Sequence, residues 1–477
     1  MAFQHKNYKV GIIGAGISGI AAAKQLCHYN PIVFESTDSI GGVWKHCSFN
    51  STKLQTPRCD FEFSDFPWPQ RDNSSFPSYI EVLEYLQNYA THFDVFKFVK
   101  FNSKVVQILH LNNHHHHHDH EYGRLLSGRP VWEVAVENNQ TKIVEWYGFE
   151  LLVVCIGKYG DIPIIPVYPK NKGPENFSGK VLHTMEYSKL DKESAKELLK
   201  GKKVAVVGYK KSAIDLAMEC AQANSGGGGQ PCTMVIRTLH WTVPSYWRKA
   251  ISKFIESYLV WKLPLEKYGL KPEHQFVEDY ASCQMAILPD NFFSEAEKGM
   301  IQFKKVSSSK WWFWKNGIEF EDKTKLEADV VVLATGFDGK KKLQSLLPEP
   351  FRSLVVDQSG IMPLYRGTIH PLIPNMAFVG YIESISNLQT AELRCKWLAR
   401  LADEQFKLPS VTKMIEQTTQ EIQIMKRTTR FYKRLCISTF SINHNDVICQ
   451  EMGLNPWRKT SLFSEAFSPY TSQDYYF

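Results

Sequence analysis

The sequence contains 477 residues, of which 43% are hydrophobic and 22% charged, and its net charge is +7. One hydrophobic core rarely grows past ~250–300 residues, so we expect two or more domains. The charge is spread too thinly for a nucleic-acid-binding surface, and no apolar run approaches the ~20 residues of a membrane span.

The chain opens with a pattern that predicts a strand, a helix and a second strand. Residues 8–14 (YKVGIIG) are an apolar run ending in glycine, which is typical of a buried parallel strand. Residues 17–29 have helical spacing, and residues 31–35 (PIVFE) predict the next strand. A loop-rich stretch at 41–77 and an amphipathic helix at 78–93 follow.

Residues 98–108 and 131–152 alternate between apolar and polar side chains and predict a β-meander. The segment between them carries the histidine run His114–His118. Neighbouring imidazoles can bind a metal ion, but a polar stretch inside a hairpin connection is typical of a solvated loop. We interpret the run as a loop and expect no metal site.

The second half of the chain repeats the opening pattern. Its predicted elements, in order, are a buried strand at 151–157, a proline-rich link, a strand–turn–helix at 202–223, a strand at 233–237, a mostly helical stretch at 245–300, buried strands at 329–337 and 375–380, and a helix from about Thr390. We expect the strands at 329–337 and 375–380 to rejoin the first unit.

These elements predict an α/β protein with two Rossmann-like dinucleotide-binding domains, the NADPH domain being inserted into the FAD domain. We expect the first part of the FAD domain at 1–165 and the NADPH domain, with a helical insertion, at 166–328. Residues 329–477 would hold the second part of the FAD domain and a C-terminal segment on the substrate side.

A glycine-rich motif at the end of the first strand predicts the FAD site. Gly14, Gly16 and Gly19 form G-x-G-x-x-G. The first glycine allows a tight turn, the second lets the backbone approach a pyrophosphate, and the third lets helix and sheet pack closely. Glu35 ends the second strand, where an acid binds ribose hydroxyls, and the helix N-terminus favours phosphate.

The second motif is less regular. Gly208 starts the turn, but Lys210 occupies the position of the second glycine, and Lys211 and Ser212 follow. A side chain at position 210 should hinder close backbone approach, unless the turn differs or the lysines contact phosphate themselves. Arg237 ends the next strand where no acid is present, which favours a ribose 2′-phosphate and hence NADPH.

The ten cysteines are scattered and none forms a Cys-x-x-Cys pattern. This spacing argues against zinc sites and against a dithiol oxidoreductase. The N-terminus leads straight into the first strand, and the polar ending SPYTSQDYYF is no membrane anchor. We therefore expect a reduced, cytoplasmic protein, with at most a peripheral association with the endoplasmic reticulum.

Residues 177–187 (FSGKVLHTMEY) match the pattern F-x-G-x-x-x-H-x-x-x-Y through Phe177, Gly179, His183 and Tyr187. This pattern identifies class B flavin-containing monooxygenases, and the sequence resembles that family along essentially its whole length. Further matching segments, in family order, are GGVW at 41–44, FSDFPWP at 63–69, LATGF at 333–337 and FVG at 378–380. KKSAID and MGLNPWRK make the chain most similar to the plant group that includes pipecolate N-hydroxylase.

The resemblance implies an enzyme that uses FAD, NADPH and molecular oxygen, and that transfers one oxygen atom from a flavin hydroperoxide to a soft nucleophile. Baeyer–Villiger relatives carry Trp at the last fingerprint position, followed by Pro or Asp, whereas this chain has Tyr187 and Ser188. That favours N-hydroxylation of an amino acid or amine, with S-oxygenation of a thioether as the alternative. The flavin carries the difficult chemistry, so no protein nucleophile is required.

The resemblance also assigns residues to the site. Gln55 stands where broad-substrate relatives carry Asn close to flavin and NADP, and it is the candidate for hydrogen bonding to the reactive intermediate. Gly42 and Trp44, from the GGVW segment, are expected at the FAD, and His183 is expected to position NADP. Asn387, with Thr390, precedes the late helix and is expected to meet the flavin, unless these residues merely cap the helix.

Two rival functions share parts of this pattern. A flavin disulfide reductase has the same two-dinucleotide layout, but the absence of Cys-x-x-Cys argues against it. A catalytically silent flavoprotein that acts as a binding partner stays open because fold alone does not give function. Lys210 and Lys211 make the second dinucleotide motif irregular, which is why this alternative is retained.

Overall fold

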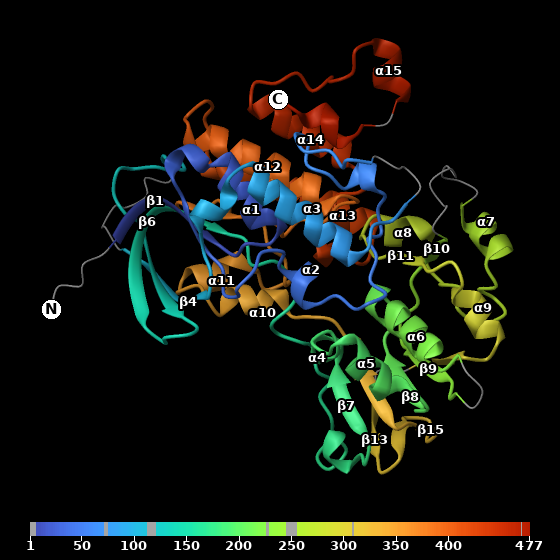
Figure 1. Cartoon of the computed structure of the whole chain (residues 1–477). Coiled ribbons are helices and arrows are strands. Elements are labelled where there is room, and N and C mark those ends of the chain that lie inside the picture. The colour runs from blue at the N-terminus through green and yellow to red at the C-terminus, as the bar shows by residue number, and fades with distance from the viewer. Residues whose placement is uncertain are drawn as a thin grey trace.

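The structure is a computed structural model of the chain, shown in Figure 1. It describes residues 6–70, 75–111, 121–225, 229–244, 255–307, 310–468 and 470–477. The histidine run 114–118 and residues 245–254 of the predicted helical stretch lie outside the described residues.

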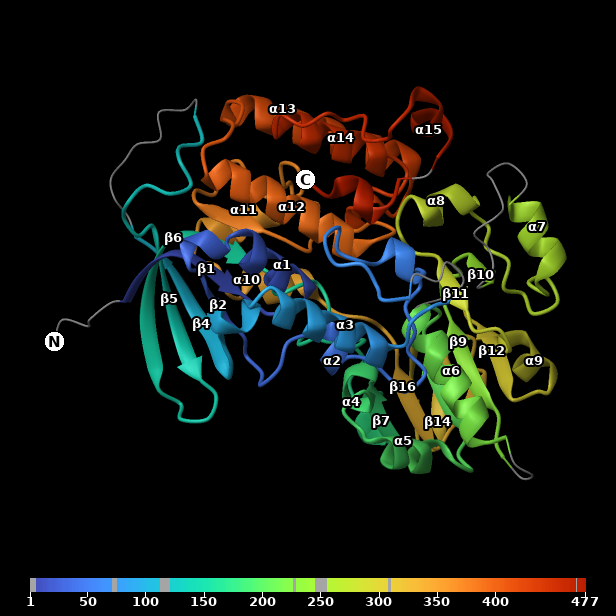
Figure 2. The same ribbon diagram turned by 45° about the horizontal axis from the view of Figure 1, so that its top comes forward.

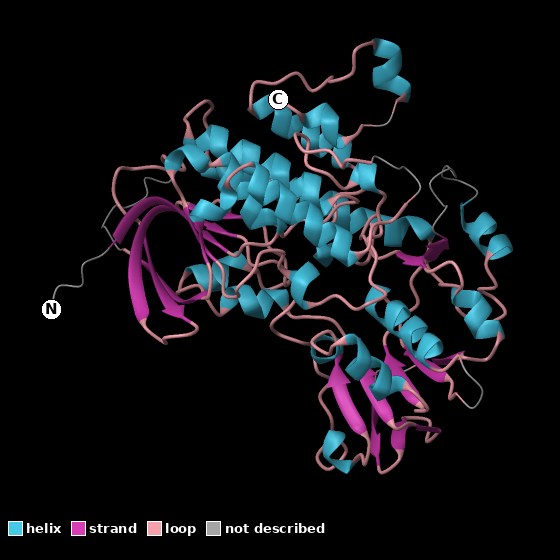
Figure 3. Ribbon diagram, in the orientation of Figure 1, coloured by secondary structure: helices cyan, strands magenta, loops and turns pink. Residues whose placement is uncertain are grey.

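The first sheet has seven strands in the order β3-β2-β1-β6-β5-β4, with β17 paired to β6. Its strands are β1 (Lys6–Ile13), β2 (Ile32–Phe34), β3 (Val99–Lys100), β4 (Ser103–His110), β5 (Trp132–Asn138), β6 (Val144–Val154) and β17 (Met376–Phe378). The predicted meander is present as β4-β5-β6, and the predicted α/β class is confirmed (Figure 3). The hairpin and the buried strand predicted around residue 151 are one strand, because β6 begins antiparallel to β5 and ends parallel to β1 and β17.

Helices and strands cover both faces of this sheet because its central strands are apolar on both sides. Val10 and Ile12 of β1 pack in one core with α1 (Ile17–Gln25), α3 (Tyr79–His92) and α12 (Asn387–Ala402). Ile13 of β1 and Val154 of β6 pack in another core, with the meander, α10 (Gly339–Gln344) and α11 (Phe351–Val355).

The second sheet is parallel throughout, in the order β12-β9-β8-β16-β7. Its strands are β7 (Lys180–His183), β8 (Val204–Val207), β9 (Cys232–Ile236), β12 (Ile301–Lys305) and β16 (Val330–Leu333). The helices α4 (Thr184–Tyr187), α5 (Lys192–Leu199) and α6 (Lys211–Ala223) lie around it, and β13 (Trp311–Trp314), β14 (Gly317–Phe320) and β15 (Lys325–Glu327) form a small antiparallel sheet beside it. This is the predicted second Rossmann-like unit.

One strand assignment is wrong. The strand at 329–337 was expected to rejoin the first sheet, but β16 pairs with β7 and β8 in the second sheet. The predicted boundary between residues 328 and 329 therefore falls within the inserted unit. The strand at 375–380 does rejoin the first sheet, as β17 beside β6. Both runs are apolar and buried on two sides, so their sequences do not reveal which of the two sheets each strand joins.

Two linkers join the halves, and they lie side by side. The backbone N–H of Ile164 donates to the carbonyl of Gly336 at 2.9 Å, and that of Asp338 donates to Ile162 at 2.8 Å. Pro163 and Phe337 form an isolated antiparallel bridge between these bonds. The second unit is thus inserted into the first through a pair of adjacent chain segments.

The remaining helices lie above the first sheet and beside the second (Figures 1 and 2). They are α2 (Val43–His46), α7 (Ile255–Lys262), α8 (Phe276–Tyr280), α9 (Phe292–Glu297), α13 (Val411–Thr428), α14 (Ser441–Glu451) and α15 (Leu462–Phe467), and the short strands β10 (Thr242–Pro244) and β11 (Ala286–Leu288) pair near α8. Within the described residues, none of the helices is both long and apolar enough to cross a membrane.

Cys283 and Cys436 form a disulfide, and the other eight cysteines are free. This differs from the expectation of a wholly reduced protein. The two residues are 153 positions apart in the sequence, and only the packing of the segment after α8 against the C-terminal region brings them together. Sequence spacing gives no signal for such a pair.

Candidate functional site

The turn between β1 and α1 needs glycine at two of its three motif positions. Gly14 has a φ of +97°, and a Cβ there would lie 2.8 Å from the carbonyl oxygen of Cys155. A Cβ on Gly19 would lie 1.8 Å from the carbonyl oxygen of Gly14. Both positions therefore exclude a side chain, and Gly19 lets α1 pack directly on the turn.

Gly16 is different because space is open beside it. The nearest atom to a Cβ there would be the Cα of Gly42, at 3.7 Å, and Gly42 itself has a φ of +53°. α1 starts after Gly16 with no side-chain cap and no acidic residue in its first turn. Two bare glycines and an open helix N-terminus form a cradle that fits a pyrophosphate. Trp44, in α2, lies half-buried with its ring against Phe61.

Glu35 is held at the edge of this turn. Its Oε2 accepts the backbone N–H of Ala15 at 2.8 Å, and its Oε1 accepts both the backbone N–H and the hydroxyl of Thr37 at 2.9 Å. The residue is 7% exposed. The carboxylate is thus fixed beside the backbone of the glycine motif, in the position that suits a ribose hydroxyl.

The C-terminal part of the chain also reaches this turn. Gly380, in the FVG segment, is so close to Ser18 that a Cβ on it would lie 2.6 Å from the Ser18 hydroxyl. Asn387 is the first residue of α12 and is exposed, and its Oδ1 accepts the backbone N–H of Ser384 at 3.0 Å. Thr390 is buried, and its hydroxyl contacts that of Ser384. The N-cap of α12 is Ser386, so neither Asn387 nor Thr390 is the capping residue.

The second turn has nearly the backbone of the first despite its lysine. Gly208 has a φ of +145°, and a Cβ on it would lie 2.6 Å from the carbonyl oxygen of Ala334. Lys210 precedes α6 with φ −109° and ψ −177°, whereas Gly16 precedes α1 with φ −74° and ψ −170°. The turn itself therefore does not differ, because extended backbone accommodates any residue, and the predicted hindrance of close backbone approach by the Lys210 side chain stays a prediction.

The other residues predicted for NADPH lie around the start of α6. Lys211 forms an ion pair with the buried Asp215 one turn along, and burial, ahead of the opposing effect of Lys211, raises the pKa of Asp215 to about 6. Ser212 is exposed in the first turn of α6, which has no acidic residue. Arg237, directly after β9, is exposed, and its guanidinium has no partner among the described residues.

The fingerprint residues have clear structural roles. Phe177 stacks on Phe313 with ring centroids 5.6 Å apart, and a Cβ on Gly179 would lie 2.3 Å from both the Phe177 ring and the carbonyl oxygen of Asp329. His183 caps α4, since its Nδ1 accepts the backbone N–H of Met185 at 3.1 Å. The pattern F-x-G-x-x-x-H therefore includes positions that fix β7 and begin α4.

His183 is buried, with its Nε2 unpaired among the described residues and its ring against Phe337. Burial lowers the pKa of His183, so its neutral form is favoured. A neutral imidazole at the linker can position a cofactor without carrying charge. Nε2 is thus available to a cofactor at the linker, and the positioning role of His183 stays a prediction.

Tyr187 and Ser188 contact a loop of the first unit, residues 46–55, which we call the junction loop. Tyr187 donates to Glu219 at 2.5 Å, and Glu219 accepts both the backbone N–H and the hydroxyl of Ser51 at 2.8 Å. Ser188 donates to the carbonyl of His46 at 3.0 Å. The fingerprint tyrosine therefore belongs to a buried tether between the two dinucleotide units, because its hydroxyl orients Glu219, which binds Ser51 across the boundary. Sequence reasoning missed Ser51 and Glu219, which carry no motif.

Gln55 lies at the other end of the junction loop. Its Oε1 accepts the backbone N–H of Ile287, in β11, at 2.9 Å, so its side chain also bridges the two units. The side chain is exposed, and its Nε2 donates to none of the described residues. The amide thus presents a donor at the junction while its oxygen is held.

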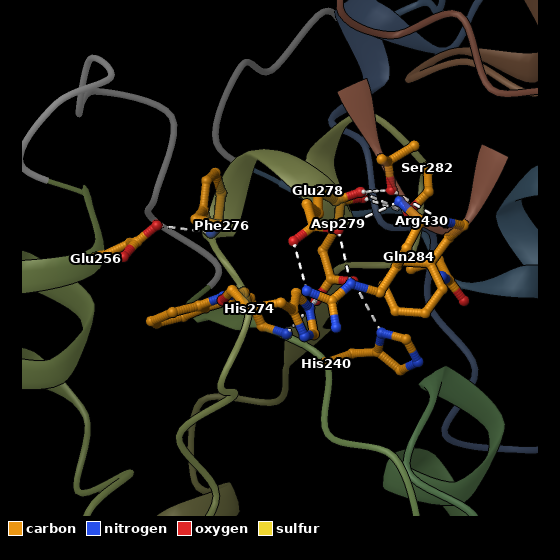
Figure 4. A network of polar contacts seen from close by, with 12 residues as sticks. His240, Glu256, His274, Phe276, Glu278, Asp279, Ser282, Gln284 and Arg430 are labelled. Atoms are coloured by element: carbon orange, nitrogen blue, oxygen red, sulfur yellow. Dashed lines mark hydrogen bonds and ion pairs between the residues drawn. The ribbon is translucent and has the colours of Figure 1, made fainter. Parts of the chain in front are cut away.

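His240, His274 and Asp279 form a buried group within the inserted unit (Figure 4). His240 Nδ1 lies 2.8 Å from Asp279 Oδ1, while His274 Nε2 and the backbone N–H of Trp241 lie 2.9 and 2.6 Å from Oδ2. Two of these nitrogens, His240 Nδ1 and the backbone N–H of Trp241, are hydrogen-bonded to the carboxylate, whereas His274 Nε2 lies close to it without a hydrogen bond. We interpret the group as an anchor for the chain that follows Arg237.

The C-terminal strap, residues 429–438, joins the inserted unit to the first. Arg430 donates from Nε and an Nη to both carboxylate oxygens of Glu278, at 2.8 and 3.0 Å, as Figure 4 shows. The disulfide between Cys436 and Cys283 lies at the other end of the strap.

Glu383 links the strap to the end of β6. It accepts hydrogen bonds from Lys158 at 3.1 Å, Tyr159 at 2.7 Å and Arg434 at 2.7 Å. Burial alone would raise the pKa of Glu383, but the charges of Lys158 and Arg434 outweigh it and lower that pKa to about 2. The network holds three distant chain segments together at the junction.

A cavity of about 430 Å³ lies elsewhere, at the amino ends of the strands of the second sheet. Lys203, Asp329 and Gly179 are among its lining residues. Dinucleotides bind at the carboxyl ends of such strands, where Gly208 and Arg237 lie. The cavity is therefore separate from the candidate site.

Two glycine turns, a buried tether and a shared linker define a two-dinucleotide site, and comparison with known proteins identifies its family. Residues 7–466 match the family model described as "Flavin-binding monooxygenase-like". The chain belongs to this family. It is a flavin-dependent monooxygenase whose cofactors are FAD and NADPH.

Relatives and solved structures agree with this family. A "Probable flavin-containing monooxygenase 1" from Arabidopsis thaliana is 58% identical, over 98% of this chain and 96% of its own length. Flavin-containing monooxygenase 3 from Rattus norvegicus is 25% identical, over 94% and 83%. S-allyl-L-cysteine S-oxygenase from Allium sativum shares the fold, with a TM-score of 0.61 at 19% identity over 94% of this chain and 89% of that one. Family membership also excludes the disulfide-reductase alternative.

Proposed function

We propose that the protein transfers one oxygen atom from molecular oxygen to the nucleophilic nitrogen of an amine or amino acid. The observation that carries this proposal is family membership over residues 7–466, joined with the two glycine turns held together by the junction loop. Bound FAD, reduced by NADPH, supplies the activation of oxygen. The protein positions the cofactors and substrate and excludes water.

Each unit contributes its own binding groups. We propose that the open N-terminus of α1, with Gly16 and Gly42, receives the pyrophosphate of FAD, and that Glu35 receives its ribose. The start of α6 and Arg237 would hold NADPH, because an exposed arginine after β9 suits a 2′-phosphate.

The choice of nitrogen rests on the resemblance to the plant group that includes pipecolate N-hydroxylase. Tyr187, which sets this chain apart from the Baeyer–Villiger pattern, is buried, and its hydroxyl is hydrogen-bonded to Glu219. It therefore supports domain geometry and does not itself select between nitrogen and sulfur. S-oxygenation of a thioether is the second candidate, favoured by the shared fold with an S-oxygenase.

A substrate panel tests the proposal. The purified, FAD-loaded protein is mixed with NADPH and oxygen and with matched amines, amino acids and thioethers, and products are identified by mass spectrometry. We expect an N-hydroxylated product and NADPH consumption in equal amounts. Sulfoxide formation without any N-oxygenated product would replace the first candidate by the second, and NADPH oxidation that yields only hydrogen peroxide with every substrate would contradict both.

A further inference from the structure

Lys210 replaces the second glycine of a dinucleotide motif without changing the path of the turn. In the first unit, the equivalent Gly16 leaves bare backbone beside the phosphate position. In the second unit the same extended backbone carries a long cationic side chain at the N-terminus of α6. The Lys210 side chain therefore occupies space that a glycine would leave free, but it brings a positive charge to the place where a pyrophosphate would lie.

The resting partner of Lys210 is a neutral group. Its ammonium donates to the side-chain carbonyl oxygen of Gln284, in the segment after α8. Lys210 is exposed as a whole residue, but partial burial of its ammonium, followed by the nearby charge of Arg434 and, more weakly, of Arg237, lowers the pKa of Lys210 to about 8. Glu383 and Asp279 act in the opposite direction.

A charged acceptor would displace the neutral one. The bond to Gln284 has one charged partner, whereas a bond between the ammonium and a phosphate adds the attraction between two opposite charges. Lys211, the other lysine of the motif, is already paired with the buried Asp215. Lys210 is thus the motif lysine whose contact is readily exchanged.

We propose that Lys210 leaves Gln284 when the nicotinamide dinucleotide binds and donates to its pyrophosphate, replacing by a side chain the backbone contact that the second glycine normally allows. Arg237 then recognises the 2′-phosphate and Lys210 the pyrophosphate. This inference rests on the proposed NADPH site, and it assigns each cation to a different part of the same ligand.

Truncated ligands separate the two roles. Dissociation constants of NADP⁺, NAD⁺ and 2′-AMP for the oxidised, FAD-loaded protein are measured by calorimetry, without turnover. We expect Lys210→Met to weaken the binding of NADP⁺ and of NAD⁺ by the same factor, about tenfold, and to leave the binding of 2′-AMP unchanged. Arg237→Met should weaken NADP⁺ and 2′-AMP and leave NAD⁺ unchanged. Lys142→Met, on the exposed β5–β6 turn, is the matched control.

Gln284→Leu distinguishes an exchangeable partner from a structural one. Removing the neutral acceptor should leave NADP⁺ affinity unchanged or raise it about twofold, because Lys210 then loses only its resting contact. Weakening as large as that caused by Lys210→Met would overturn the proposal, as would a Lys210→Met protein of normal melting temperature that binds NADP⁺ like the wild type. Because no product is measured, failure to N-oxygenate any substrate would contradict the proposed function alone.

Discussion

Gly16 and Gly19 stand in the same turn, but an added methyl group would meet very different surroundings. At position 19 it would lie 1.8 Å from the carbonyl oxygen of Gly14, whereas at position 16 it would make only an ordinary contact with Gly42. The fold therefore requires glycine at position 19, whereas the proposed cofactor contact requires glycine at position 16.

We therefore expect Gly19→Ala to destabilise the protein by about 2–3 kcal/mol, because strand and helix must move apart. Gly16→Ala should leave the stability of the FAD-free protein unchanged or slightly higher, since its φ of −74° suits alanine, while FAD content falls at least tenfold. Thermal melts and flavin absorbance at equal protein concentration measure both effects. A Gly16→Ala protein that retains full FAD would show that the pyrophosphate lies elsewhere.

Gln55 joins two roles in one side chain, because Oε1 holds Ile287 and Nε2 is available at the junction. We expect Gln55→Glu to keep an acceptor for Ile287 but to remove the donor. The fraction of NADPH electrons lost as hydrogen peroxide should then rise severalfold with little change in melting temperature. Gln55→Ala should show the same loss together with a lower melting temperature. Normal coupling in both variants would exclude Gln55 from the oxygenation step.

At the scale of single elements, the short helix α4 supports the contact between the cofactor units, because the Tyr187 hydroxyl orients Glu219 toward Ser51 of the junction loop. Tyr187→Phe removes the donor to Glu219, and both groups are buried. We expect a loss of about 1–3 kcal/mol in the free energy of unfolding. The matched control is Tyr381→Phe, since the buried Tyr381 hydroxyl has no partner among the described residues. Equal stability losses in the two variants, measured by urea unfolding, would contradict a tether.

Most elements near the glycine motifs are predictable because their local signals agree. The strand before Gly14, the helix after it and the helix capped by Ser78 are placed within a few residues of their observed bounds. β16 was assigned to the wrong sheet because strand pairing is a long-range property. Within the junction loop the family resemblance marks Gln55, but nothing in the sequence marks Ser51 or its partner Glu219, because these two acquire their roles only when segments 168 residues apart meet.

At the scale of the whole molecule, the strap makes stability sensitive to reducing agent. A disulfide that closes a segment of 153 residues is expected to stabilise the fold by about 2–4 kcal/mol. Dithiothreitol should lower the melting temperature of the wild type but not that of the Cys283→Ser, Cys436→Ser double variant. The control is Cys27→Ser, which removes an exposed free thiol. Titration of ten thiols in the unfolded, unreduced protein would contradict the bond.

Glu383 makes the same junction sensitive to acid. Its pKa in the folded protein is about 2, below the ordinary 4.5, so its contribution to stability is complete above pH 4.5 and is lost as the pH falls toward 2. Glu383→Gln should destabilise the protein at neutral pH by about 3–5 kcal/mol, because Lys158 and Arg434 lose their buried partner. Between pH 5 and 3.5 its stability should fall less steeply than that of the wild type. Parallel pH profiles for the two proteins would refute the assignment.

The pairing of β17 with β6 has a consequence for how the protein is made. All strands of the second sheet precede residue 334, whereas the first sheet needs residues 376–378 to be completed. On the ribosome, the inserted unit can therefore acquire its full sheet while the first unit still exposes an unpaired edge of β6. A nascent chain arrested shortly before residue 376 would contain every strand of the inserted unit, while the sheet of the first unit would still lack β17.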